Sequence, residues 1–64
     1  MKLDITKRDN KTGKYIEVVK SFSIKDKDDK EAWKIANEYA SKKNKSFVGM
    51  IYKKYYYEVE FNPD

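Results

Sequence analysis

The chain has 64 residues, 41% of them charged, with a net charge of +4 and neither cysteine nor histidine. The missing residue types exclude disulfides, thiol nucleophiles, Ser-His-Asp triads and zinc sites built on Cys or His. A chain of this length forms one domain at most, residues 1–64, and buries only about 60% of the surface that its unfolded form exposes.

The first residues alternate between polar and apolar side chains, with Leu3 and Ile5 on one side, which is typical of a half-buried strand. The segment 8–14 follows and contains Asp9 and Gly13. Because Asp bonds its own backbone and Gly accepts a positive φ, this segment predicts a hairpin loop of four or five residues.

A return strand is then expected from about residue 14 to residue 24. Strict alternation along it places one set of side chains inward against the core, namely Ile16, Val18, Phe22 and Ile24. Lys20 interrupts this inner set. The same alternation points the other side chains away from the core, namely Tyr15, Glu17, Val19, Ser21 and Ser23.

A helix follows, and Asp28 with Glu31 fits a capping box at its start, although Asp26 offers an alternative cap. Asn44 is expected to close it in the left-handed conformation. An apolar stripe at helical spacing should face the sheet, made of Ala32, Ile35, Ala36, Tyr39 and Ala40, with Trp33 on its flank. The main anchors of the core are then predicted to be Trp33, Phe22 and Ile35.

The last apolar segment, residues 47–61, allows two interpretations. A turn at Lys53-Lys54 would make it a hairpin and give a ββαββ domain, with one helix on one face of a four-stranded antiparallel sheet. A single long bent strand would instead give ββαβ. The hairpin is favoured because a strand of about fifteen residues exceeds the usual length.

One helix covers only one face of a sheet, so the opposite face, called the open face below, should keep apolar side chains exposed. Under the hairpin register these predicted partner-binding residues are Tyr15, Val19, Phe47, Ile51 and Tyr56. The single-strand register replaces Phe47 and Ile51 by Val48, Met50 and Tyr52. Since exposed aromatic patches often mark interfaces, the leading hypothesis is a small protein-binding module for another protein or a second copy of the chain. It would dock through the open face or add a partner strand at a sheet edge, as an inhibitor or adaptor of a larger protein.

A second hypothesis, nucleic-acid binding, comes from charge. If the helix runs antiparallel to the second strand, its end returns to the level of the hairpin loop. The expected phosphate-binding residues at that end are Lys7, Arg8, Lys11, Lys14, Lys42, Lys43 and Lys45. Lys53 and Lys54 are expected at the opposite end. A third possibility is a stable small domain with no partner.

Catalysis is not expected, because the sequence shows no nucleophile–base pattern, no glycine-rich phosphate loop and no metal-ligand spacing. We therefore expect no enzyme activity, no cofactor, no metal and no small-molecule substrate. The sequence shows no apolar leader and no membrane-length apolar run, which favours the cytoplasm. Small size and richness in Lys, Asn and Tyr are similar to those of phage and mobile-element accessory proteins, a likeness of composition alone.

Overall fold

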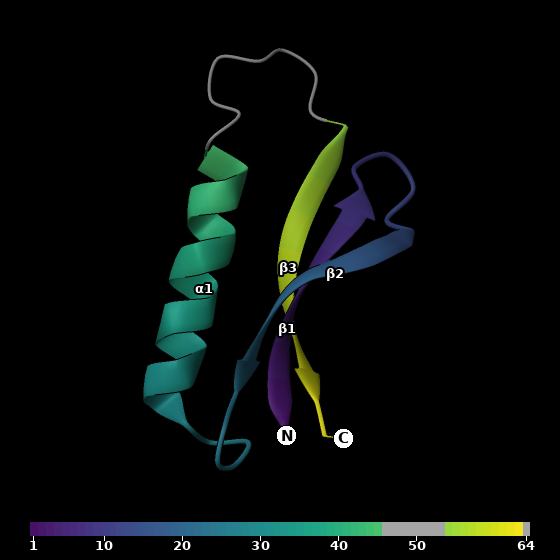
Figure 1. Cartoon of the computed structure of the whole chain (residues 1–64). Coiled ribbons are helices and arrows are strands. Elements are labelled where there is room, and N and C mark those ends of the chain that lie inside the picture. Colours follow the sequence, from purple (N-terminus) through teal and green to yellow (C-terminus); the bar gives the residue numbers. More distant parts are fainter. Residues whose placement is uncertain (46–53, 64) are drawn as a thin grey trace.

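The computed structural model describes residues 1–45 and 54–63. In chain order its elements are β1 (Lys2–Asp9), β2 (Tyr15–Ser23), α1 (Lys30–Lys45) and β3 (Tyr55–Asn62) (Figure 1). The strands form one antiparallel sheet in the order β2-β1-β3, with β1 in the centre. The expected class, one helix and an antiparallel sheet, is confirmed.

The predicted four-stranded ββαββ arrangement is not matched, because the described residues form three strands in the order ββαβ. The element order of the alternative, ββαβ, is the order of the described elements, although Lys54 lies in a bend and β3 begins at Tyr55. Residues 46–53, which include the predicted first half of the hairpin, lie outside the described part of the chain.

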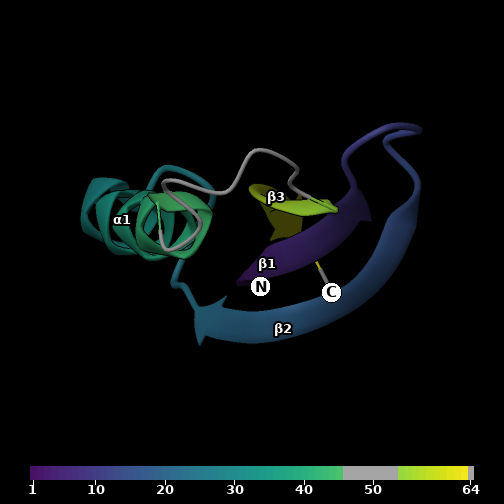
Figure 2. The ribbon, with the colours of Figure 1, turned by 90° about the horizontal axis from the view of Figure 1, so that it is seen from above.

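The core lies between β1, its neighbours and α1. Leu3 and Ile5 of β1 are 0% exposed, and in β3 they pair with Phe61 and Val59 on the same side of the sheet. Seen from above, β2 curves around β1 while α1 stands beside the sheet (Figure 2). The helix contributes two small buried residues, Ala36 and Ala40, and short side chains allow a close approach to the sheet.

Two register shifts in the β1–β2 pairing overturn the strict alternation predicted for β2. Ile5 pairs with Lys20 but Thr6 pairs with Val18, so Val19 is an extra residue in the ladder. A β-bulge of this kind changes which face the following side chains occupy. Val19 consequently packs against the core, although it was predicted on the open face.

The second register shift lies between Lys7 and Arg8 and leaves Ile16 as the extra residue. Ile16 and Val18, both predicted inward, are 41% and 39% exposed. The prediction was wrong for both because it assumed an unbroken period of two along a strand with two irregularities.

The N-cap of α1 lies one residue later than the predicted Asp28, and the helix begins at Lys30. The carboxylate of Asp29 accepts the backbone N–H of Ala32 at 3.2 Å, which makes Asp29 the N-cap in place of Asp28 or Asp26. Asp26 instead accepts the N–H of Asp28 at 2.9 Å within the preceding turn. The described residues contain no helix long and apolar enough to cross a membrane.

The predicted inward stripe of α1 is confirmed at four of its five residues. Ala36 and Ala40 are buried, and Ala32 and Tyr39 pack against the core. Trp33 also packs against the core, and its indole N–H donates to the carbonyl oxygen of Lys27 at 2.7 Å. Ile35 is 50% exposed, so it is not the anchor that its position in the apolar stripe indicated.

Candidate nucleic-acid interface

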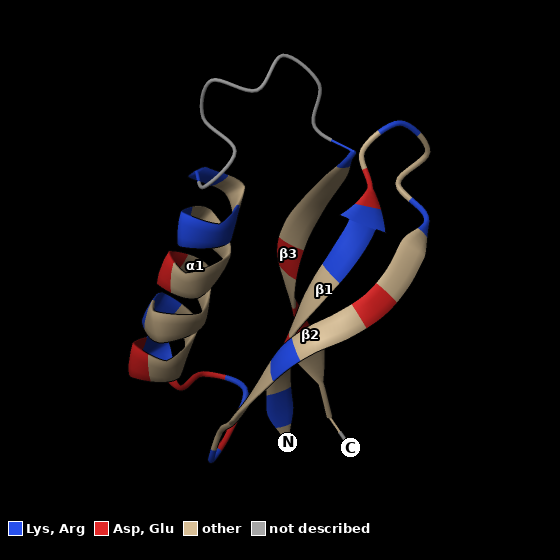
Figure 3. Cartoon of the chain, turned by 45° about the horizontal axis from the view of Figure 1, so that its top comes forward, with Lys and Arg blue, Asp and Glu red and all other residues tan. Residues whose placement is uncertain are grey.

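Lysines from four separate segments gather at one end of the molecule. The chain runs up β1, down β2 and up α1, so the C-terminal end of α1 returns to the level of the β1–β2 loop, as predicted (Figure 1). Basic residues line the end of β1, that loop and the last turn of α1 (Figure 3). We call this set the basic pole; it consists of Lys7, Lys11, Lys14, Lys42, Lys43, Lys45 and Lys54.

Lys54 belongs to this pole and not to the opposite end where it was predicted. The backbone N–H of Asn10 in the β1–β2 loop donates to the carbonyl oxygen of Lys54 at 2.9 Å. The next residue, Tyr55, pairs with Asp9 at the end of β1. The prediction was wrong because it placed Lys54 in the turn of a hairpin, whereas the residue lies beside the loop at the upper end of β3.

The basic pole carries most of the molecule's charge asymmetry. Its seven lysines stand with two acidic residues, Asp9 and Glu17, whereas the rest of the sequence contains eight basic and nine acidic residues. Such a separation of charge attracts polyanions and orients them toward one end during encounter.

The β1–β2 loop that presents Lys11 and Lys14 is held by Asp9. The Asp9 carboxylate accepts the backbone N–H groups of Lys11 and Thr12 at 2.8 and 3.0 Å. These bonds hold the pKa of Asp9 below its usual value, and the bond from Thr12 has the largest effect. Gly13 has a φ of +75° and its N–H donates to the carbonyl oxygen of Asp9 at 2.8 Å. The expected five-residue loop with a left-handed Gly13 is therefore confirmed.

Arg8, predicted as a phosphate contact, is already paired within the sheet. Its guanidinium forms ion pairs with Glu60 and, at 3.4 Å, with Glu58 of β3. It also donates to the carbonyl oxygen of Gly13 at 2.9 Å. The hydrogen bond that Arg8 donates to Glu60 is the largest cause that raises the pKa of Arg8. Arg8 thus fixes the loop to β3 and is not counted in the basic pole.

Tyrosine rings lie among the lysines of the pole. The Nζ atom of Lys7 is 4.1 Å from the centre of the Tyr55 ring, and Glu17 faces Lys7 across the β1–β2 register. The Nζ atom of Lys43 is 5.8 Å from the centres of the Tyr39 and Tyr57 rings. Cation–π contacts of this length hold lysine side chains against the surface.

The open face differs from the apolar patch that was predicted. Tyr15 and Tyr56 do lie on it, because they pair with Arg8 from either side. Val19 lies on the helix side, and Phe47 and Ile51 are outside the described residues. The patch therefore keeps two of its five predicted members among the described residues.

A hydrogen-bonded polar network fills the middle of the open face. Asp4 accepts the hydroxyl of Ser21 at 2.7 Å and the amide of Asn62 at 3.1 Å. Thr6, only 2% exposed, donates its hydroxyl to Glu60 at 3.2 Å. The neighbours of β1 thus cover it with polar side chains, which alternation alone does not reveal.

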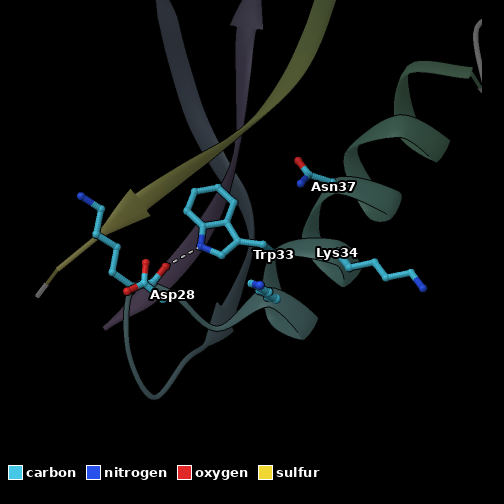
Figure 4. Close-up of a pocket in the computed structure, with 6 residues that line it drawn as sticks. Asp28, Trp33, Lys34 and Asn37 are labelled. Carbon is cyan, nitrogen blue, oxygen red and sulfur yellow. Dashed lines mark hydrogen bonds between the residues drawn. The ribbon is translucent and has the colours of Figure 1, made fainter.

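A separate open depression lies at the other end of α1. Trp33 forms its floor, with Asp28, Lys34 and Asn37 around it (Figure 4). Lys27 and Lys30 complete a lining of mixed charge, and nothing in it pairs a nucleophile with a base. Among residues 1–45 and 54–63 no group of His, Cys, Asp and Glu side chains could hold a metal ion.

Comparison with known protein families, curated proteins and solved structures finds no match for this chain.

Proposed function

We propose that the chain is a non-catalytic, cytoplasmic nucleic-acid-binding protein that contacts phosphates through the basic pole. The observation that carries this proposal is the convergence of seven lysines from β1, the β1–β2 loop, the end of α1 and the start of β3. These segments are far apart in the sequence, and the fold brings them to one end, where Asp9 and Glu17 are the acids that stand with them.

The composition of the pole favours phosphates over specific bases. Lysine ammonium groups attract phosphate as point charges, whereas sequence readers rely on the planar guanidinium of arginine for bidentate contacts to guanine. The single arginine, Arg8, is paired with Glu58 and Glu60. The proposed binding is therefore electrostatic and depends little on sequence.

The test is binding of labelled DNA and RNA as a function of salt. If about five lysines contact phosphate, log K should fall by roughly 4 to 5 per decade of salt on duplex DNA and by somewhat less on single strands. The variant Lys42→Glu/Lys45→Glu places acids in the pole. It should bind more weakly, and the salt slope should fall by about 1 for each lost contact.

The matched control is Lys30→Glu/Lys34→Glu, which makes the same charge change in the first half of the same helix. It should leave most of the affinity in place. Equal losses in both variants would show that net charge and not the pole is responsible. A signal that does not depend on salt would exclude phosphate binding by the pole.

A second candidate, self-association, is favoured by the exposed apolar residues of β2. Tyr15, Ile16 and Val18 account for three of the five large hydrophobic side chains that are exposed among the described residues. The same face carries Glu58 and Glu60 against a single arginine. We propose as its occupant the basic pole of a second copy, because the two surfaces are opposite in charge.

Such a contact joins different surfaces of the two copies and therefore leads to open chains instead of closed dimers. Light scattering at low salt should show a mass that rises with concentration and returns to the monomer at high salt. A constant monomer mass excludes this candidate and leaves nucleic-acid binding in place.

A further inference from the structure

We infer that the row Tyr15–Arg8–Tyr56 at the upper end of the open face takes unpaired bases, so that the ligand of the basic pole is single-stranded nucleic acid. This inference rests on the proposed function and specifies the substrate of the same site. It starts from two tyrosines, Tyr15 and Tyr56, that lie next to lysines of the basic pole.

The two rings flank one residue of the central strand. Tyr15 on β2 and Tyr56 on β3 both pair with Arg8, so their Cα atoms lie one strand spacing to either side of β1. Tyr15 is 55% exposed. The hydroxyl of Tyr56 lies 3.7 Å from the position that a Cβ atom on Gly13 would occupy, so this side chain crosses β1 toward the hairpin loop.

Three lysines of the basic pole lie close to this row along the chain. Lys14 precedes Tyr15, and Lys11 lies in the same loop. Lys54 is two residues before Tyr56 and bonds to Asn10 through its backbone. Rings within a basic surface are the arrangement by which proteins hold single strands, with bases stacked on aromatics and phosphates on cations.

The rest of the open face disfavours a duplex lying across it. The rows below Arg8 carry Glu58 opposite Thr6 and Glu60 opposite Asp4, and these carboxylates repel phosphates. In a duplex the bases are stacked on one another, so the rings of Tyr15 and Tyr56 would gain nothing. A strand with free bases uses both the lysines and the rings.

The experiment compares three probes of about 12 nucleotides at about 50 mM salt: oligothymidylate, an abasic strand of the same length and charge, and a duplex. The full chain should bind oligothymidylate at least roughly fivefold more tightly than the abasic strand, which has the same phosphates but no bases. The variant Tyr15→Ser should reduce that ratio toward one, and Tyr15→Phe should keep it.

Val18→Ser is the matched control, because Val18 is an exposed residue on the same strand and face, beside Thr6 instead of Arg8. It should keep the ratio of the unchanged chain. Equal affinity for oligothymidylate and the abasic strand overturns this inference while the proposed function stands. Tighter binding of the duplex also overturns it, and no binding of any probe overturns both. If Tyr15→Ser does not fold, the comparison of the three probes on the unchanged chain still tests the inference.

Discussion

The side-chain amide of Asn44 forms with Tyr57 the two hydrogen bonds that a neighbouring strand would form. The N–H of Tyr57 donates to Asn44 Oδ1 at 3.0 Å, and Asn44 Nδ2 donates to the carbonyl oxygen of Tyr57 at 3.2 Å. Among residues 1–45 and 54–63, β3 is the outermost strand on its side of the sheet, and Asn44 takes up two of its outer backbone groups. Asn44 therefore joins the end of α1 to the sheet.

The prediction that Asn44 closes the helix in the left-handed conformation was wrong. Helix α1 continues to Lys45, and no described non-glycine residue has a positive φ.

Replacing Asn44 by Ala should lower the free energy of unfolding by about 1–3 kcal/mol, because the half-buried backbone groups of Tyr57 lose their partners. Urea unfolding measures this change, and hydrogen exchange at the Tyr57 amide should become faster. The control Asn37→Ala removes an exposed asparagine from the same helix and should change stability by less than about 0.5 kcal/mol. If both variants behave alike, the Asn44–Tyr57 pairing contributes nothing to stability.

The bulge in β2 predicts opposite results at two adjacent valines. Val19→Ser should destabilise the chain by about 1–2 kcal/mol, because Val19 packs against the core. Val18→Ser should stay within about 0.5 kcal/mol, because its side chain is exposed. Unfolding curves of the two variants give the comparison. If Val18→Ser destabilised the chain more than Val19→Ser, the regular alternation predicted from the sequence would be correct for this strand.

The orientation of α1 can be tested with two isoleucines. Ile5→Ala should cost about 2–5 kcal/mol, enough to unfold much of a domain this small, because Ile5 is fully buried in the central strand. Ile35→Ala should cost less than about 0.5 kcal/mol, since half of the residue is exposed. Circular dichroism during thermal unfolding distinguishes them. A large loss at Ile35 would mean that its side chain packs in the core together with the rest of the predicted stripe.

Local patterns predicted the elements because each depends on neighbouring residues. Leu3 and Ile5 on the inner face and the loop with Gly13 at positive φ were derived from periodicity and turn chemistry and are confirmed. The return of α1 to the level of the loop followed from the element order.

Other features depend on contacts between distant residues and leave no local signal. The bulge at Val19 arises in the pairing with β1, and the place of Lys54 depends on which strand β3 joins. The pairing of Arg8 with Glu60 spans 52 positions of sequence. For the candidate site, the sequence therefore predicted most of the lysines but not the neutralised arginine.

The last prediction concerns the contribution of the Asp9 carboxylate to stability as a function of pH. Hydrogen bonds from the backbone N–H groups of Thr12 and Lys11 favour the ionised carboxylate, so the pKa of Asp9 is lower in the folded chain than its ordinary value of 3.8. A lowered folded pKa adds stability above the unfolded pKa, and that stability is lost as pH falls from about 4 through the folded pKa. We expect Asp9→Asn to be less stable than the unchanged chain between about pH 5 and 7, and this difference to shrink at about pH 2. Urea midpoints measured across that range test it, because the other carboxylates are common to both proteins and cancel. A difference that is constant with pH would mean that Asp9 acts only as a neutral acceptor in the loop.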